Sequence, residues 1–234
     1  MNILRRYLSP VLFPARCAGC GQVIEPPMPE TPVPSVCQDC VRALERTEQF
    51  SLRGNLTEDL FATNHQFERA ATFCFYDKHD LVSHLIQNAK YGRQPEINYE
   101  LARLAALDGL QSDFFDDISI IIPVPLHPRR YRQRGYNQSD YIARGLSDVL
   151  HIPVDTTHIT RIRNNPQQAL TRGKERERNV EGVFDVNHPE EMYRRHILIV
   201  DDVITTGSTI RSCMKTISAF RGARISVFAL AKAR

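Results

Sequence analysis

The chain has 234 residues, which is enough for one full α/β domain and a small additional module but too short for two large domains. Its 42% hydrophobic and 24% charged residues exclude a disordered or fibrous protein. The 30 Lys and Arg residues exceed the 27 Asp and Glu residues by three, and this small net charge neither requires nor excludes a nucleic-acid partner.

The N-terminal stretch does not have the composition of a targeting or membrane segment. Arg5, Arg6, Pro10 and Pro14 interrupt its apolar residues. The stretch therefore fits neither a signal peptide nor a membrane span, which needs roughly 18 apolar residues. We expect a cytoplasmic protein with no membrane insertion, in which the six cysteines are not disulfide-bonded by default.

Four of the six cysteines form two C-x-x-C pairs, Cys17 with Cys20 and Cys37 with Cys40, separated by 16 residues. This spacing favours a four-thiolate zinc site, and four thiolates leave no open position on the metal, so the zinc would be structural. The proline-rich stretch between the pairs cannot form a core of its own, and a module this small needs a metal. The alternatives are two pairs that arose by chance and a thioredoxin-like redox motif, which needs only one of the two pairs.

Composition divides the chain into three parts. We expect a zinc-finger module over residues 1–50, a linker with turn-like residues over 51–67, and one larger domain over 68–234. The larger domain alternates apolar strands with amphipathic helices, which favours a mostly parallel sheet covered on both faces.

In chain order, the first expected elements are a strand at 70–76, helices at 80–90 and 97–110, and a strand at 118–122. A loop rich in Pro and Arg follows, and then a helix at 138–150 with Asn137 as its N-cap. The remaining elements are a strand at 154–159, a polar stretch at 163–179, a strand at 196–200, a helix from about 208 and a strand at 225–230. Cys74 and Cys213 lie on apolar patterns and are expected in the core.

The stretch that carries the predicted site begins where the strand at 196–200 ends in two acids, Asp201 and Asp202. The loop that follows and opens a helix consists of Thr205, Thr206, Gly207, Ser208 and Thr209. Ligands of open α/β sheets bind beyond the carboxyl ends of the strands, and amides at a helix N-terminus together with hydroxyls bind phosphate. Carboxylates repel phosphate but accept hydrogen bonds from sugar hydroxyls, so we infer a sugar-phosphate ligand. The alternative is that the acids only cap the helix, for which one aspartate would suffice.

This stretch resembles the phosphoribosyl pyrophosphate (PRPP) motif of class I phosphoribosyltransferases. Nearly the whole chain resembles the ComF/GntX family of competence-associated, phosphoribosyltransferase-like proteins, through the cysteine pairs and through Lys90-Tyr91, Pro123-Val-Pro125, Arg134-Gly-Tyr-Asn-Gln138 and the segment 168–179. The resemblance implies a class I phosphoribosyltransferase-like α/β fold with an N-terminal zinc ribbon. It also implies that Asp201 and Asp202 bind the ribose hydroxyls and that residues 205–209 bind the 5′-phosphate.

By the same resemblance, the loop after the strand at 118–122 faces the pyrophosphate. Arg129 and Arg134 are the expected ligands there, because guanidinium groups match phosphate oxygens, and Lys90 reaches the same phosphates. Mg²⁺ accompanies PRPP and binds largely through substrate oxygens, so no protein cage for it is expected. The segment 163–179 resembles the mobile lid of these enzymes.

We therefore expect a protein that binds PRPP with Mg²⁺ and transfers ribose 5-phosphate with release of pyrophosphate, with Asp201 and Asp202 as the central acids. The family resemblance links this activity to DNA uptake and use, and implies a competence helicase as a partner. Two alternatives stay open: a non-enzymatic factor that binds single-stranded DNA through the basic stretch with Tyr131 and Tyr136, and a PRPP sensor without chemistry. The acceptor is not identified by any motif.

Overall fold

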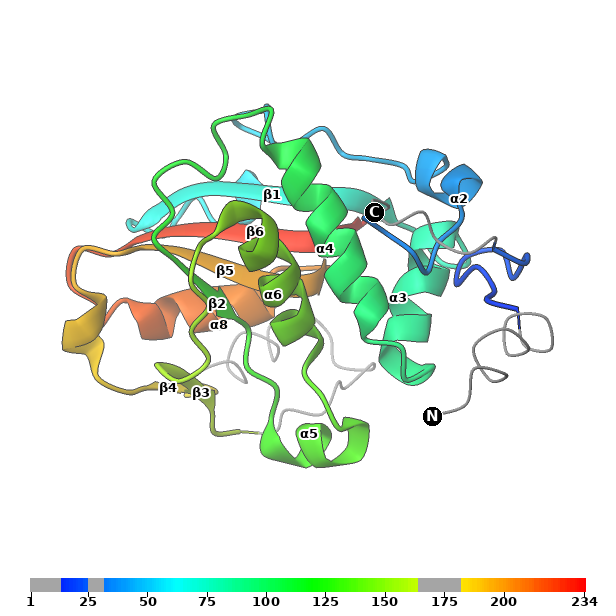
Figure 1. The fold of residues 1–234 in the computed structure, drawn as a ribbon. Coiled ribbons are helices and arrows are strands. Elements are labelled where there is room, and N and C mark those ends of the chain that lie inside the picture. The colour runs from blue at the N-terminus through cyan, green and yellow to red at the C-terminus, as the bar shows by residue number, and fades with distance from the viewer. Residues whose placement is uncertain (1–13, 25–31, 164–181) are drawn as a thin grey trace.

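A four-stranded parallel sheet forms the centre of the molecule (Figure 1). The computed structural model describes residues 14–24, 32–163 and 182–234. In spatial order, the strands are β1 (Phe67–Tyr76), β6 (Arg224–Ala233), β5 (His196–Ile204) and β2 (Ile120–Pro123), each parallel to its neighbours. The predicted parallel α/β sheet is confirmed.

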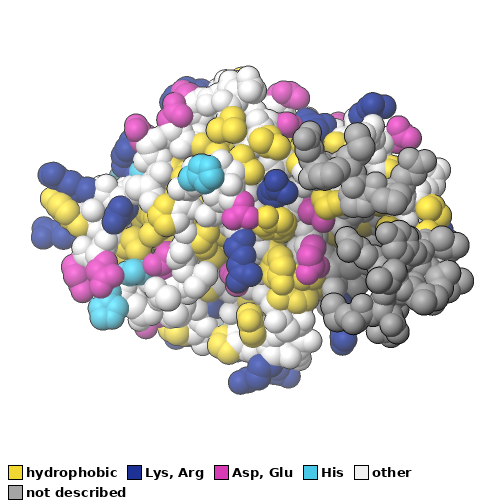
Figure 2. All heavy atoms as spheres, viewed as in Figure 1, with side chains coloured by type: hydrophobic (Ala, Val, Ile, Leu, Met, Phe, Trp, Pro, Cys, Tyr) yellow, Lys and Arg dark blue, Asp and Glu magenta, His cyan; other side chains and the backbone are white. Residues whose placement is uncertain are grey.

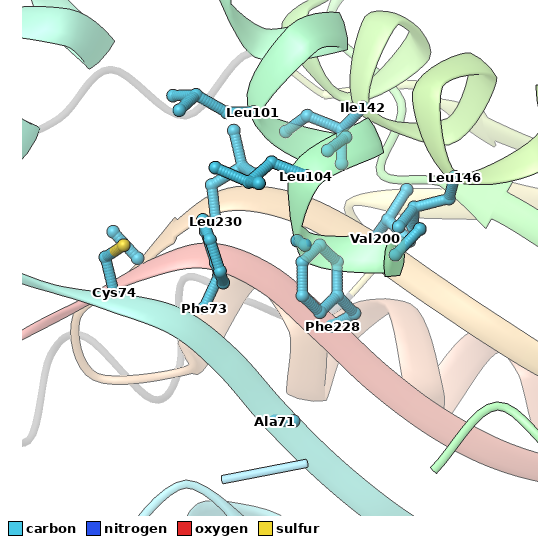
Figure 3. Packing of buried hydrophobic residues seen from close by; sticks show 14 of the residues in the cluster. Ala71, Phe73, Cys74, Leu101, Leu104, Ile142, Leu146, Val200, Phe228 and Leu230 are labelled. Atoms are coloured by element: carbon cyan, nitrogen blue, oxygen red, sulfur yellow. The ribbon is translucent and has the colours of Figure 1, made fainter. Parts of the chain in front are cut away.

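Helices cover both faces of this sheet. On one face lie α3 (Leu81–Tyr91), α4 (Glu96–Gly109) and α6 (Gln138–Leu150), and on the other lies α8 (Ser208–Ile217). Because side chains alternate along a strand, β5 supplies both cores. Leu198 and Val200 pack with α4 and α6, whereas the side chains of Ile197 and Ile199 pack with α8. Figure 3 shows the first core, with Val200, Phe228 and Leu230 of the sheet beneath Leu104, Ile142 and Leu146 of the helices.

Three sequence predictions in this domain need correction. The predicted loop after β2 contains a helix, α5 (Pro128–Arg134), whose N-cap is His127. The predicted strand at 154–159 is wrong in extent: Val154 forms only an isolated bridge with Ile121, and the strand β3 (Ile159–Arg161) pairs antiparallel with an unpredicted strand, β4 (Phe184–Val186). Finally, β5 does not end at residue 200 but continues to Ile204.

Three short helices complete the described elements: α2 (Gln38–Arg42) and the 3₁₀ helices η1 (Glu58–Leu60) and η2 (Pro189–Met192). Cys74 and Cys213 are buried in the core as predicted, and burial raises the pKa of each thiol to about 12. The predicted lid at 163–179 lies outside the described residues, except for Arg163. Within the described part of the chain, no helix combines the length and apolarity needed to cross a membrane.

Residues 45–61, which include much of the predicted linker, pack along β1. The Thr47 amide donates to the Phe73 carbonyl (3.0 Å), and the Phe75 amide donates to the Glu45 carbonyl (2.9 Å). Farther along, the side-chain oxygen Oε1 of Gln49 accepts a hydrogen bond from the Thr72 amide (3.0 Å). The same segment places Phe50 in one core and Phe61 in the other. Division of the chain at residues 50 and 67 stays a prediction.

Candidate functional site

The two acids of the predicted motif lie near the carboxyl end of β5, within the strand. Asp201 is opposite Ala229 of β6, and its Oδ1 accepts a hydrogen bond from the Ser139 hydroxyl at the start of α6 (3.1 Å). Asp202 forms an ion pair with Lys90 at the end of α3, with 2.7 Å between Oδ2 and Nζ. Three elements that are far apart in sequence therefore meet at this acid pair.

The environment of the acid pair changes its proton affinity. Burial, followed by the negative charge of Asp202, raises the pKa of Asp201 to about 7. Burial alone would lower the pKa of Lys90, but the charge and hydrogen bond of Asp202 raise it. Asp201 can thus exchange a proton near neutral pH, while Lys90 keeps a positive charge beside it.

The predicted phosphate loop follows directly and ends at the N-terminus of α8. Gly207 is buried and has a φ of 71°, in the left-handed region that favours glycine, and an added Cβ there would lie 3.1 Å from Cε1 of Phe61. Thr205 and Thr206 are exposed, and Ser208 and Thr209 are half-buried. The loop thus offers hydroxyls and the first amides of a ten-residue helix beside the two acids.

The arginines predicted to contact pyrophosphate lie on α5, but in different surroundings. Arg129 is exposed, whereas Arg134 is half-buried, donates to Oε1 of Gln138 (2.6 Å) and lies 5.8 Å from the ring centre of Tyr91. Lys90 lies against Asp202 rather than apart from the acids.

Sequence reasoning missed two residues of this site. Ser139 binds Asp201, and the charge of Arg161 on β3 acts on the same carboxyl group. Ser139 could have been predicted. It lies near the start of the helix predicted at 138–150, and that helix begins at the carboxyl edge of the sheet, where ligands bind. No local pattern marks Arg161, since β3 has only three residues.

The four predicted zinc ligands, Cys17, Cys20, Cys37 and Cys40, lie together, with their Sγ atoms all within 4.8 Å of one another. The Sγ atoms of Cys20 and Cys37 are 3.7 Å apart, close to the roughly 3.8 Å expected for two ligands of a tetrahedral zinc with 2.3 Å bonds. Burial opposes ionisation of Cys17, but backbone amides, first that of Cys37, lower the pKa of its thiol to about 6. The cluster could hold a metal ion such as zinc.

The comparisons with known proteins agree with this geometry. The model of the phosphoribosyl transferase domain family matches residues 138–234, which contain α6, the acid pair and the loop before α8. Competence protein F of Haemophilus influenzae is 35% identical over 170 residues, which cover 68% of this chain and 74% of that protein. This chain belongs to the ComF/YhgH competence family. Its fold is α/β and phosphoribosyltransferase-like, as predicted.

Another member of the ComF/YhgH family shows a similar sequence identity and coverage. The DNA utilization protein YhgH of Escherichia coli K12 is 34% identical over 154 residues, covering 64% of this chain and 67% of that protein. Among solved structures, a hypoxanthine phosphoribosyltransferase from Staphylococcus aureus aligns with 59% of this chain and 73% of its own, at 11% identity and a TM-score of 0.37, which is too low to carry an argument.

Proposed function

We propose that this protein binds PRPP together with Mg²⁺ and transfers ribose 5-phosphate to an acceptor, with release of pyrophosphate, in the uptake or use of DNA. The observation that supports this most is the acid pair beside the Gly207 loop, at the carboxyl edge of a parallel sheet. The link to DNA rests on the names of the relatives, a DNA utilization protein and a competence protein.

In this proposal, Asp201 and Asp202 accept hydrogen bonds from the ribose hydroxyls, and residues 205–209 bind the 5′-phosphate. Lys90 must then leave Asp202, and Arg129 and Arg134 are the proposed partners of the pyrophosphate. The bond from C1′ to the pyrophosphate oxygen breaks as the acceptor bonds to C1′, and the acceptor loses a proton. The carboxylates fit the preference of Mg²⁺ for oxygen ligands, and when bound the ion would neutralise charge on the leaving group.

Titration calorimetry with Mg·PRPP tests the binding step. The wild type is expected to bind, and the double variant Asp201→Asn with Asp202→Asn is expected to lose binding. Asp148→Asn is the matched control, because Asp148 is an exposed aspartate on α6 whose carboxylate binds Tyr99. Unchanged affinity of the double variant would contradict the sugar assignment.

Turnover needs a separate measurement. Pyrophosphate release from PRPP is expected when the correct acceptor is supplied in a screen of nucleobases, amines and nucleotides. A protein that binds Mg·PRPP but releases no pyrophosphate with any acceptor would instead be a PRPP sensor.

We also propose that Cys17, Cys20, Cys37 and Cys40 hold a structural zinc ion. The four thiolates fit zinc and leave no ligand position for water, so no step of the reaction would pass through this metal.

A second candidate function is the binding of single-stranded DNA. Exposed aromatic rings and basic side chains share one surface at α5: the side chain of Tyr91 is 76% exposed near Arg134, and Tyr131 is 49% exposed on the helix itself. Figure 2 shows basic side chains at the lower end of the molecule, where Figure 1 places α5. Such surfaces bind single strands by charge and stacking. The affinity for single-stranded DNA should then fall steeply as the salt concentration rises, and no binding at low salt would exclude this function.

A competence helicase as a partner of this protein stays a proposal.

A further inference from the structure

Arg161 is the last residue of β3. It lies outside the PRPP motif, and no sequence pattern assigns a role to it. Its guanidinium group lies 5.4 Å from the ring centre of Phe184 on β4, and its Nε is buried without a hydrogen-bond partner. A buried donor on a charged group that stays unpaired is costly. Among the described residues, Arg161 forms no ion pair within 4.0 Å. The Nε donor of Arg161 is therefore not used by any described residue.

The surroundings of Arg161 are electropositive. Burial lowers the pKa of Arg161, and the charge of Arg130 on α5 lowers it further. Among the Asp and Glu residues that the structure describes, only Asp201 acts in the opposite direction. The same two charges act on His127, the N-cap of α5. Burial, then the charge of Arg161 and then that of Arg130 lower the pKa of its imidazole. These two arginines come from separate elements, their charges act on each other, and the charge of Asp201 acts on Arg161.

A bound anion would compensate both for the unpaired donor of Arg161 and for the positive charge around it. An anion there would accept a hydrogen bond from the Arg161 Nε and would offset the repulsion between Arg161 and Arg130. The ribose would lie at the acid pair and the 5′-phosphate at the Gly207 loop, so the group that reaches the β3 and α5 side is the substituent on C1′.

We propose that Arg161 binds the pyrophosphate group of PRPP and so makes the site specific for a 1-pyrophosphate over a free 1-hydroxyl. This inference rests on the proposed function and deepens it, because it assigns the leaving group to a residue outside the sequence motifs. Arg161 holds the pyrophosphate while the bond to C1′ breaks, and its positive charge stabilises the negative charge that develops on the leaving oxygens.

The test compares three probes by titration calorimetry: Mg·PRPP, ribose 5-phosphate and inorganic pyrophosphate. Arg161→Met removes the charge but keeps the stem over Phe184, and Arg161→Lys keeps the charge but removes the planar fork. Arg103→Met is the matched control, since Arg103 is also half-buried and lies 5.9 Å from the ring centre of Tyr99. We expect Arg161→Met to weaken Mg·PRPP and pyrophosphate at least about tenfold and ribose 5-phosphate less than about twofold, with Arg161→Lys in between.

Two results would overturn the assignment. Equal losses for Mg·PRPP and ribose 5-phosphate would mean that Arg161 only positions Asp201, and unchanged affinity for all probes would mean that it contacts none of them. Circular dichroism and the melting temperature monitor folding; if Arg161→Met does not fold, the ratio of the two affinities in Arg161→Lys decides. A wild type that binds pyrophosphate through Arg161 but not PRPP would refute the proposed function and leave the anion site in place.

Discussion

Asp201 shows how much a single carboxyl group depends on its neighbours. It accepts a hydrogen bond from Ser139, and the charges of Asp202, Lys90 and Arg161 act on it. Its pKa is raised to about 7, mainly by burial. An isolated aspartate would be ionised throughout the neutral range. The same residue type therefore behaves here as a group that gains or loses a proton near pH 7.

This gives a pH dependence for ligand binding. If the ribose hydroxyls donate to ionised Asp201, Mg·PRPP affinity should rise about tenfold between pH 6 and pH 8, because the carboxyl must lose its proton to accept both hydrogen bonds. Calorimetry across this range measures the effect. Asp201→Asn should remove it, and any slope that remains in this variant belongs to the phosphate groups of the ligand.

Stability without ligand should depend on the same group in the opposite sense. The folded-state pKa lies above the unfolded value of about 3.9, so the folded chain keeps a proton that the unfolded chain has lost between about pH 4 and pH 7. The free energy of unfolding should therefore fall as pH rises through this window. Denaturant titrations of the wild type should show this slope, and Asp201→Asn should reduce it; an identical slope in both would contradict the assignment.

At the site, sequence and structure agree on residues that are close in the chain. The acids and the loop at 205–209 could be predicted because the motif is local and ends a buried strand. The contacts of Lys90 with Asp202 and of Ser139 with Asp201 depend on how distant elements pack, and so does the effect of the Arg161 charge on Asp201; no local pattern encodes any of them.

Among the elements, α4 and α6 approach each other closely at Gly145. A Cβ at this position would lie 2.3 Å from the Tyr99 carbonyl oxygen and 2.9 Å from Cβ of Ala102. Gly145→Ala should therefore destabilise the protein by about 1–3 kcal/mol. On an exposed helix, the same change would instead increase helix stability by about 1 kcal/mol. Thermal unfolding measures the difference. Ser147→Ala on the same helix should change stability by less than about 0.5 kcal/mol.

The start of β1 is tied to the segment before it by a buried ion pair. Arg69 donates from Nε to Glu58 (3.0 Å) and from Nη1 to Asp113 (2.9 Å), and Arg69 and Glu58 are both buried. Arg69→Met should cost about 3–5 kcal/mol, because it leaves a buried carboxylate without its partner. Arg53→Met should cost less than about 1 kcal/mol, because its pair with Asp113 is exposed. Similar costs in denaturant unfolding would contradict this reading.

The success of element prediction followed the strength of the local pattern. The helix at 138–150 was predicted with the observed bounds because an apolar face repeats along it. The helix α5 has no buried residue and therefore no apolar period to detect. The strands β3 and β4 have three residues each, and their pairing spans more than twenty residues of chain, so no short window could reveal them.

At the scale of the whole molecule, the cysteine cluster shares a core with the larger domain. Cys17 and Cys40 belong to the same buried cluster as Leu85 and Leu101, and Asn88 on α3 donates to the Ala18 carbonyl (2.8 Å). Glu100 on α4 also accepts hydrogen bonds from the amide and hydroxyl of Ser35 (both 2.8 Å). A loss of structure around the metal should therefore spread into α3 and α4.

Removal of the metal tests this coupling. Elemental analysis should find about one zinc per chain, and chelation or Cys20→Ser should lower the melting temperature of the whole chain by about 5 °C or more, in a single transition. Cys20 is exposed, so the serine adds little packing cost of its own. Cys74→Ala should keep the zinc. A zinc-free chain with an unchanged melting temperature would refute the structural metal.

The segment that runs along β1 also protects the protein from self-association. An outer strand with free amides invites a strand of another molecule to add to it, which leads to aggregation. Here the amides of Ala70, Thr72 and Phe75 already donate to Glu58, Gln49 and Glu45. At the opposite margin, Ile121 of β2 exchanges backbone hydrogen bonds with Pro153 and Asp155. In the part of the chain that the structure describes, both margins of the sheet are thus occupied by the chain itself, and these amides are not open to a second copy.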